Sequence, residues 1–345
     1  MAHPRDAREL DPQSATSIIR WDLVLGEWIT VARHRQNRTH LPPQDECPLC
    51  PSSRNRLTEI PSPDYDVVVF ENRFPSFATP PDELAIDGYA LEQILHIGEQ
   101  RLGFGRCEVV CFTSEHDSAF PQFSPSRVRT ILDAWIDRSD ELAALPFIEQ
   151  VFCFENRGEE IGVTLSHAHG QIYAYPFITP RTQRMLENAR AYHRATSRNL
   201  FVDLLSAEIK FEERIVHLGE HWTAFVPFAA RWPLEVHLYP NRQLASLSDL
   251  SEEERDEFSN LYPSLLRQME RAFGASLPYI SAWHQAPTHQ GRELAYLHLE
   301  VSSIRRSPGK LKYLAGSESA MGAFINDVLP EETAERLRNA RVSEH

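Results

Sequence analysis

Residues 166–173 have the sequence Ser166-His167-Ala168-His169-Gly170-Gln171-Ile172-Tyr173. Because alternate side chains of a β-strand share a face, His167 and His169 are expected to point in the same direction. Two imidazoles at one site can bind a metal ion, attack a phosphorus atom, or do one each. A glycine-bearing loop, residues 158–162, precedes them and can bring backbone amides close to a phosphate. Two histidines on an exposed strand face would be the simpler interpretation, but Gly170-Gln171 and the further ligand candidates favour a site.

A second candidate motif is the Cys-x-x-Cys pair formed by Cys47 and Cys50, within the proline-rich segment 39–63 that we expect to be loop. This spacing is typical of one half of a tetrahedral zinc site. The other two ligands must come from elsewhere in the chain, and the candidates are His116 and His167. A redox dithiol is an alternative, but such a pair is expected at the start of a helix. Chance pairing of two cysteines is a further alternative.

The charge balance excludes one broad class of function. The 345 residues include 49 acidic and 35 basic side chains, which gives a net charge of -14. That balance argues against a protein whose main role is to coat nucleic acid, although a few local arginines can still bind small phosphate ligands. No apolar run is long enough to cross a bilayer, and the N-terminal residues lack the apolar stretch of a secretory signal. We therefore expect a cytoplasmic protein with neither membrane nor nucleic acid as partner.

The five cysteines do not suggest a disulfide framework, since they are few and unevenly placed for a chain of this length. Their thiols are expected to be reduced. Cys107, Cys111 and Cys153 lie in apolar, strand-like runs, where cysteine usually acts as a small hydrophobic residue.

Short apolar runs rich in β-branched and aromatic residues predict the strands of one sheet. They are residues 28–32, 67–70, 109–112, 147–154 and 172–177. Apolar residues at helical spacing predict a core-facing helix over 128–145. Residues 182–205 and 251–273 are also expected to be helices, the latter beginning with the capping box Ser251 and Glu254.

An internal repeat predicts the fold class. Residues 108–112 lead through a loop to a helix at 123–124, and residues 235–239 lead with the same spacing to a helix at 250–251. The strand with His169 then corresponds to a strand near His298. Two such units predict an α+β fold of two similar half-domains, built on mainly antiparallel sheet with helices packed to one side. Chance similarity of two amphipathic units is the alternative.

Further motifs recur along nearly the whole chain and give it a specific resemblance. Besides the segments above, they are Gly26-Glu27-Trp28-Ile29, His34-Arg35-Gln36-Asn37-Arg38, Phe70-Glu71-Asn72-Arg73-Phe74, Cys111-Phe112-Thr113-Ser114-Glu115-His116, Phe154-Glu155-Asn156-Arg157-Gly158, Trp283-His284-Gln285-Ala286-Pro287, Lys312-Tyr313-Leu314-Ala315-Gly316-Ser317-Glu318 and Glu335-Arg336-Leu337. With these motifs in this order, the chain resembles the galactose-1-phosphate uridylyltransferases, a family of the histidine triad superfamily.

The resemblance implies two histidine-triad-like halves, residues 1–178 with the zinc site and the nucleophile, and residues 179–345 with a hexose-binding segment. It implies a structural zinc ion (Zn2+) held by the four residues Cys47, Cys50, His116 and His167. His169 would then be the free nucleophile. Gln171 matches the glutamine that hydrogen-bonds the phosphoryl oxygens and stabilises the charge that builds in the transition state.

The resemblance also implies an activity, the exchange of UMP between UDP-glucose and galactose 1-phosphate in the Leloir pathway of galactose metabolism. The mechanism would be ping-pong through uridylyl-His169, in a cytoplasmic homodimer whose substrates are UDP-glucose, UDP-galactose and hexose 1-phosphates. One alternative is a nucleotidyltransferase, phosphorylase or hydrolase that acts on another nucleotide sugar. Another is a non-catalytic nucleotide-sugar sensor, although a sensor has no need of a nucleophile.

The resemblance assigns substrate contacts in three groups. The uridine contacts are Phe70, Asn72, Asn156 and Thr164; the phosphate contacts across a dimer interface are Arg35 and Arg38; and the hexose contacts are Lys312, Tyr313, Ala315 and Glu318. Core packing is the simpler interpretation of the aromatic ring among them, and solvated charge is the simpler interpretation of the two arginines.

The chain departs from the family pattern at two places. Some members bind a second metal ion, iron or zinc, and here its ligands would be His284, His298 and Glu300. Where the better-known pattern has two histidines on that strand, this chain has a histidine and a glutamate, and Met185 stands where a further glutamate ligand is expected. We therefore expect this site to be altered or empty. The second departure is Ala168, which replaces a proline between the two histidines.

Overall fold

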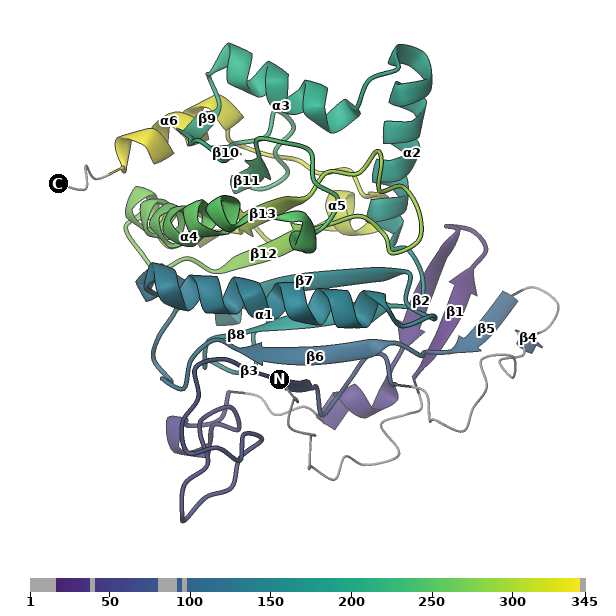
Figure 1. Ribbon diagram of the computed structural model, residues 1–345, viewed down its shortest axis with the longest axis vertical. Helices are drawn as coiled ribbons and strands as arrows, with labels where there is room; N and C mark the ends of the chain where they lie inside the picture. Colours follow the sequence, from purple (N-terminus) through teal and green to yellow (C-terminus); the bar gives the residue numbers. More distant parts are fainter. Residues whose placement is uncertain (1–16, 38–40, 80–91, 95–97, 342–345) are drawn as a thin grey trace.

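The computed structural model describes residues 17–37, 41–79, 92–94 and 98–341. A nine-stranded antiparallel sheet forms its centre (Figure 1). In spatial order its strands are β3 (Val68–Glu71), β6 (Arg106–Cys111), β8 (His169–Tyr175), β7 (Gln150–Arg157), β12 (Tyr279–His284), β13 (His298–Ser303), β11 (Leu234–Pro240), β10 (Trp222–Phe225) and β9 (Ile215–Leu218).

The order of the strands repeats around the middle of this sheet. In the first half β6 pairs with β8 and β8 with β7, and in the second half β11 pairs with β13 and β13 with β12. The two halves meet where β7 pairs with β12, with Phe154 opposite Ala282. The predicted α+β fold of two similar, mainly antiparallel halves is therefore confirmed. The division between residues 178 and 179 stays a prediction.

Two long helices cover one face of the sheet, one from each half. They are α1 (Pro125–Ala143) and α4 (Glu252–Phe273), which lie side by side in Figure 1. Ser251 caps α4 in a capping box with Glu254, as predicted. A single hydrophobic core lies beneath both helices, and in it the ring of Trp283 packs against those of Trp135 and Trp222. The core is therefore shared by the two halves.

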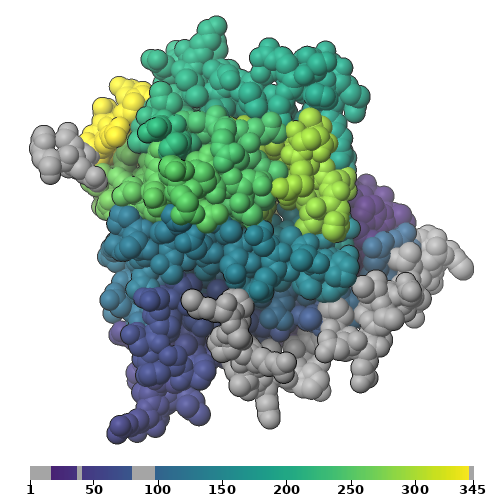
Figure 2. Space-filling view, viewed as in Figure 1, coloured from purple at the N-terminus to yellow at the C-terminus, as the bar shows by residue number. Residues whose placement is uncertain are grey.

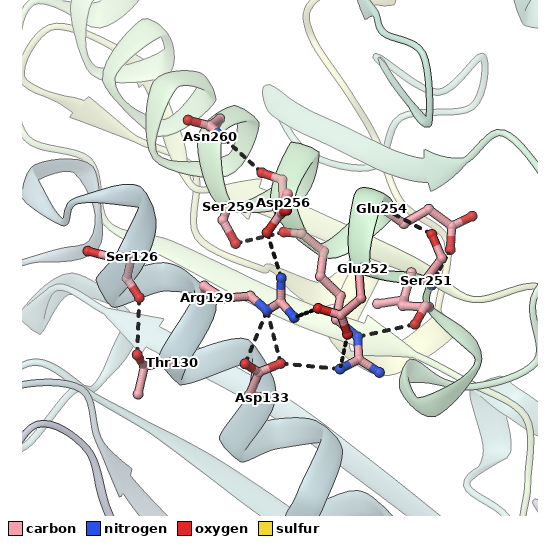
Figure 3. Close-up of polar contacts among 12 residues, drawn as sticks. Ser126, Arg129, Thr130, Asp133, Ser251, Glu252, Glu254, Asp256, Ser259 and Asn260 are labelled. Atoms are coloured by element: carbon pink, nitrogen blue, oxygen red, sulfur yellow. Dashed lines mark hydrogen bonds and ion pairs between the residues drawn. The ribbon is translucent and has the colours of Figure 1, made fainter.

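Ion pairs join the exposed sides of the same two helices (Figure 3). The guanidinium of Arg129 on α1 bonds to Asp133 on its own helix and to Glu252 and Asp256 on α4. Arg255 of α4 in turn contacts Asp133. These contacts connect the halves at the surface, above the shared core.

The predicted single helix over 182–205 is wrong, because the structure contains two helices there. These are α2 (Pro180–Thr196) and α3 (Leu200–Phe211). The chain turns at Ser197, whose φ of 58° is left-handed, and Asn199 begins the next helix by accepting hydrogen bonds from Phe201 N and Val202 N.

The prediction that all helices pack to one side is also wrong. Ala189 of α2 and Leu205 of α3 pack against Phe225 and Tyr239, which belong to a cluster separate from the core beneath α1 and α4. These helices therefore cover the opposite face of the sheet, and only over its second half. The first half leaves that face open to the site described below.

The strand predicted at 28–32 forms, but it belongs to a different sheet. A separate four-stranded sheet has the order β2 (Glu27–Val31), β1 (Ile18–Asp22), β5 (Gly98–Leu102) and β4 (Glu92–Ile94). Its first two strands are joined by a tight turn in which Gly26 has φ 68°, and Trp21 pairs with Trp28. The backbone of β2 pairs with β1 in this local hairpin, so β2 does not join the central sheet.

The remaining elements are short. They are the hairpin of β14 (Arg305–Ser307) and β15 (Lys310–Leu311), the helices α5 (Gly316–Met321) and α6 (Pro330–Asn339), and the 3-10 turns Arg33–Asn37, Gln44–Glu46, Phe120–Gln122, Glu159–Ile161 and Leu247–Asp249. Figure 2 shows the segment after residue 41, in dark blue, as a lobe at the edge of the first half. Within the described ranges, no helix is long and apolar enough to span a membrane.

The two repeats match as elements, but the residue alignment expected from their equal spacing is wrong by one position. That alignment sets Val110 against His237, yet Val110 lies in the core beneath the helices, whereas Val236 and Leu238 take that role in β11. Since alternate side chains face opposite ways, a shift of one residue exchanges the two faces. The loop before the second helix is therefore one residue shorter than that before the first.

Candidate active site and metal cluster

Four side chains that are far apart in the sequence converge beside β8. The ligand atoms of Cys47, Cys50, His116 and His167 all lie within 4.8 Å of one another. The Cys50 Sγ lies 3.3 Å from His116 Nδ1 and 3.5 Å from His167 Nδ1, and Cys47 Sγ lies 3.9 Å from the latter. The structure thus brings together the four metal-ligand candidates.

These separations match the geometry of a tetrahedral ion. Bonds of about 2.0–2.3 Å to nitrogen and sulfur give ligand-to-ligand edges of about 3.3–3.8 Å. The second nitrogen of each imidazole is also engaged: His167 Nε2 lies 2.7 Å from the Thr113 carbonyl oxygen, and His116 Nε2 lies 3.2 Å from Ser166 Oγ. Burial lowers the pKa of His167 to about 4, so its imidazole is neutral, as a metal ligand must be. The residues present therefore fit a metal ion.

His169, the first residue of β8, lies outside this cluster. Its Nδ1 donates a hydrogen bond of 2.7 Å to the His167 carbonyl oxygen. A proton on Nδ1 leaves the lone pair on Nε2, which is the nucleophilic nitrogen of a neutral imidazole. Burial lowers the pKa of His169, although this hydrogen bond opposes the shift. The local geometry thus prepares a neutral imidazole with a defined tautomer.

Gly170, which follows the nucleophile candidate, lies where there is no room for a side chain. A Cβ atom at this position would lie 2.7 Å from Phe112 Cζ and 3.0 Å from the Phe154 carbonyl oxygen. The position faces the core beneath α1, where Phe112 packs closely. Glycine therefore keeps β8 pressed against its neighbours, while the residues on either side face the open side of the sheet.

A cavity of 570 Å³ opens on this side of the sheet, and His169 and Gln171 both line it. Four further residues predicted to contact substrate also line this cavity, namely Arg35, Phe70, Asn72 and Thr164. Phe70 additionally packs against the apolar cluster around Cys47 and Cys111, so its ring has a packing role, and its contact with uridine stays a prediction. Arg35 belongs to the cavity of its own chain, where its Nη1 donates to the Phe74 carbonyl oxygen at 2.7 Å.

One predicted uridine contact lines a different cavity. Asn156 lines a neighbouring cavity of 280 Å³, which His167 and His169 also border. Arg38 lies outside the described residues.

Sequence reasoning gave no role to four charged residues that line the larger cavity, one of which is Glu46. The other three are Arg56, Glu59 and Arg73, and the last two form an ion pair of 2.5 Å. Arg73 directly follows Asn72 in the motif of residues 70–74, so its place in that motif could have marked it as a site residue. Arg56 and Glu59 lie in the turn-rich segment after Cys50, where nothing in the sequence pointed to them.

The predicted hexose-binding residues form a separate group in the C-terminal part. Lys312 Nζ lies 3.5 Å from Glu318 Oε1, and both side chains are largely buried. Tyr313 is 65% exposed. None of the four residues Lys312, Tyr313, Ala315 and Glu318 lines the His169 cavity of the same chain.

The second set of metal-ligand candidates also converges, on the face of the sheet beneath α2. Ligand atoms of His284, His298 and Glu300 lie within 4.8 Å of one another, and the same holds for Glu235, His237 and Glu300. Burial alone would raise the pKa of Glu300, but the imidazoles of His284 and His237 hold it well below its ordinary value. Sequence reasoning missed the two residues on β11, because their carboxylate and imidazole lie near the others only in the folded sheet.

Comparisons with known proteins agree with these features. The model of the galactose-1-phosphate uridyl transferase N-terminal domain matches residues 8–179, and that of the C-terminal domain matches residues 185–345. The galactose-1-phosphate uridylyltransferase of Streptomyces lividans is 46% identical, with 96% of this chain and 90% of the relative covered. That of Thermotoga maritima is 35% identical, with 94% of this chain and 98% of the relative covered.

Solved structures show the same relationship. A structure described as uridylyltransferase superposes with a TM-score of 0.81 at 31% identity, covering 94% of this chain and 98% of that one. An ADP-glucose phosphorylase from Arabidopsis thaliana shares the fold, with a TM-score of 0.72 at 22% identity, covering 95% of this chain and 99% of that one. The chain therefore belongs to the galactose-1-phosphate uridylyltransferase family.

Proposed function

We propose that this protein exchanges UMP between UDP-glucose and galactose 1-phosphate by a ping-pong mechanism in which His169 is the nucleophile. The membership of the family supports the reaction, since the named relatives cover nearly the whole chain. The observation that carries the assignment of the nucleophile is the hydrogen bond from His169 Nδ1 to the His167 carbonyl oxygen beside a cavity of 570 Å³.

The first half-reaction begins with the lone pair of His169 Nε2. It attacks the α-phosphorus of UDP-glucose, a P–N bond forms, and the bond from the α-phosphorus to the bridging oxygen breaks. Glucose 1-phosphate leaves with that oxygen and its electron pair, and uridylyl-His169 remains. In the second half-reaction, a phosphate oxygen of galactose 1-phosphate attacks the same phosphorus, and the neutral imidazole leaves. Gln171 donates from its amide to the phosphoryl oxygens on which negative charge builds.

The assignments of the substrate contacts follow from positions in the cavity. Phe70, Asn72 and Thr164 are proposed for uridine, with Asn156 at the adjoining cavity. Arg35 is proposed for the phosphates, and Arg56 and Arg73 supply further positive charge around them.

We also propose a zinc ion at Cys47, Cys50, His116 and His167, because two thiolates and two imidazoles are a typical zinc ligand set. Its role would be structural: it ties the segment of Cys47 and Cys50 to His167, and thereby fixes the carbonyl oxygen that orients His169. The ligands hold the strand, and no ligand atom takes part in the transfer.

The hexose contacts and the assembly are proposed together. Lys312, Tyr313, Ala315 and Glu318 do not line the His169 cavity of their own chain. We therefore propose a cytoplasmic homodimer in which these residues contact the hexose of a substrate bound by the other copy. Size-exclusion chromatography with light scattering measures the molar mass and so tests the dimer. Mixing His169→Gly chains with Lys312→Ala chains tests the shared site. Activity should be partly restored if His169 and the hexose contacts of one site come from different copies.

Intact-mass spectrometry tests the covalent step. After mixing with UDP-glucose, the parent protein is expected to gain the mass of one uridylyl group, in an adduct that acid removes. His169→Gly should show no gain while keeping the same zinc content, which separates loss of the nucleophile from loss of the fold. An adduct on the variant would contradict the assignment of His169.

Product analysis tests the reaction. Glucose 1-phosphate should be released catalytically only when galactose 1-phosphate is present, because the second sugar is needed to regenerate the imidazole. Catalytic release with UDP-glucose alone would indicate hydrolysis instead and would contradict the proposed transfer.

A further inference from the structure

One wall of the His169 cavity is a loop that carries two of the four metal-ligand candidates. This loop, residues 47–60, is called the cysteine loop below. It contributes six residues to the lining of the cavity, which His169 and Gln171 of β8 also line. A substrate bound at His169 therefore lies beside the cysteine loop. The six residues are Pro48, Leu49, Arg56, Leu57, Thr58 and Glu59.

The cysteine loop is held together by hydrogen bonds among its own residues. Thr58 Oγ1 donates to the Cys50 carbonyl oxygen at 2.6 Å. The backbones of Ser53 and Arg56 bond to each other in both directions, with N to O distances of 2.8 and 3.2 Å. These bonds link the two ends of the loop, so we expect it to keep its shape as one unit.

Arg56 connects the cavity with the backbone of a metal-ligand candidate. Its Nη2 donates to the carbonyl oxygen of Cys47. A guanidinium carries five N–H donors in one plane, so donors remain for an acceptor in the cavity. Within the part of the chain that the structure describes, Arg56 forms no ion pair. Its side chain therefore faces the cavity with a positive charge that no neighbouring carboxylate balances.

The other charged groups of the cavity do not supply that balance. Arg73 pairs with Glu59 at 2.5 Å, so these two charges compensate each other. Glu46 is exposed and lies in no ion pair with Arg35 or Arg56. Two positive charges thus remain in a cavity beside His169, and a bound anion would balance them.

A metal ion at the four candidates would fix Arg56 relative to the nucleophile candidate. The cluster joins both cysteines of the loop to His116 and to His167, which is two residues before His169. Because the loop behaves as one unit, holding its cysteines also holds Arg56. The contact between Arg56 and the Cys47 carbonyl oxygen adds a direct link between the cavity and the cluster.

We propose that Arg56 binds the diphosphate of the nucleotide substrate and couples phosphate binding to the metal cluster. Its planar guanidinium can donate to two phosphate oxygens while another N–H remains near the Cys47 carbonyl oxygen. A diphosphate that draws on the guanidinium thereby changes the position of Cys47. Arg56 binds and positions, and it takes no part in the bond changes at phosphorus. This inference rests on the proposed function, because it needs a nucleotide diphosphate as the ligand.

Calorimetry tests the phosphate contact on the zinc-loaded full chain with His169→Gly, which lacks the nucleophile. UDP and uridine are the two probes, because only UDP has phosphates. Adding Arg56→Ala is expected to weaken UDP binding by about 10-fold or more, and to change uridine binding by less than about twofold. Arg56→Lys should restore part of the UDP affinity, since lysine keeps the charge but not the planar fork. Arg54→Ala, which removes an exposed arginine of the same loop outside the cavity lining, is the matched control.

Cobalt spectroscopy tests the coupling in the folded, metal-loaded protein. With Co2+ in place of zinc, the thiolate charge-transfer absorption depends on the geometry of the two cysteines. Saturating UDP is expected to change this absorption in the His169→Gly protein, whereas uridine is not. Adding Arg56→Ala should abolish the change, even at UDP concentrations that saturate the variant. Plasma mass spectrometry checks that every variant holds the same amount of metal.

The outcomes separate the two parts of the proposal from the proposed function. Equal UDP affinity in the Arg56→Ala and Arg54→Ala proteins would overturn the phosphate contact, and so would an equal loss of uridine and UDP binding, since the side chain would then only hold the loop. A cobalt absorption that UDP leaves unchanged would overturn the coupling. Absence of UDP binding before Arg56 is altered would contradict the proposed function, and this inference with it. Selective weakening of UDP together with loss of the cobalt response supports both parts.

Discussion

His169 is positioned by its own backbone. A single hydrogen bond to the His167 carbonyl oxygen fixes the tautomer, and that carbonyl belongs to a residue whose side chain is one of the four metal-ligand candidates. The alternation of the strand therefore separates the proposed metal ligand from the proposed nucleophile two positions later.

The proposed role of Gln171 gives a first prediction. Gln171→Ala is expected to lower the rate of uridylylation by about 10²–10³-fold, because a donor to the developing phosphoryl charge is lost. Rapid-quench measurement of the adduct checks the rate, and the zinc content should not change. Gln183→Ala, on α2 and outside the cavity, is the matched control. A rate within a few-fold of the parent would assign the charge stabilisation to another group.

Ala168 gives a second prediction at this scale. In the described structure its N–H donates no hydrogen bond, whereas its carbonyl oxygen accepts one of 3.2 Å from Phe112 N. Proline removes this donor, which makes no bond here, and fixes φ, so Ala168→Pro is expected to retain the metal and the adduct, with activity within about threefold of the parent. Loss of the metal in this variant would show that the backbone here cannot adopt the φ that proline requires.

Glu155 gives a prediction for pH. Burial raises its pKa to about 8, against the hydrogen bond from Tyr279 and the charge of Arg157. The folded state therefore binds this proton more tightly than the unfolded chain. The resulting stability is fully present below the unfolded pKa and is lost as the pH rises from about 5 to 8. Urea unfolding of Glu155→Gln should show a smaller decline over this range than the parent, and equal slopes would contradict the shifted pKa.

At the scale of elements, the two copies of the repeated unit differ because helices cover the open sheet face of only the second copy in the described structure. Helices α2 and α3 lie over the sheet face of the second half, where Tyr239 and Tyr296 are buried. Within the part of the chain that the structure describes, no helix covers the same face of the first half, which opens into the His169 cavity. Equivalent strands thus carry an accessible imidazole in one half and a buried cluster in the other.

The ion pairs between α1 and α4 give a prediction at this scale. Arg129, with a side chain 21% exposed, bridges three carboxylates whose own exposure is 45–70%. Arg129→Ala is expected to cost about 1 kcal/mol of unfolding free energy, since exposed pairs contribute little individually. The difference from the parent should shrink in high salt, because screening already weakens these pairs in the parent. Urea titrations at two salt concentrations measure it.

At the scale of the whole molecule, the two halves form one sheet and one core. β7 pairs with β12 across the boundary, and the core beneath α1 and α4 includes residues from Val110 to Leu337. Division at residue 178 falls in the connection between β8 and α2, so it cuts no element. Separating the halves there would nevertheless expose the paired edges of β7 and β12 and the core residues that the two halves share.

A fragment of residues 1–178 is therefore expected to be unfolded or aggregated alone, and to assemble when co-expressed with 179–345. Size-exclusion chromatography and circular dichroism distinguish these states. A monomeric, folded 1–178 fragment would show that the halves are independent domains.

The sequence by itself determined the local features. The capping box of Ser251 fixed the start of α4, the Cys-x-x-Cys spacing marked one half of the metal cluster, and the alternation around His169 set its side chain apart from the core. Each depends on neighbours within a few residues, whose geometry the chain imposes directly. The resemblance to a family then predicted which residues far apart in the sequence belong to the same site.

Only the tertiary structure decided which faces and partners those residues have. Arg181 meets Glu300 across 119 positions of sequence, and His237 meets it through the pairing of β11 with β13. A one-residue difference in a loop turned the aligned residues of the two repeats to opposite faces, which equal spacing could not reveal. Register and covering helices are set by packing of the whole sheet, because only the assembled core distinguishes one face of a strand from the other.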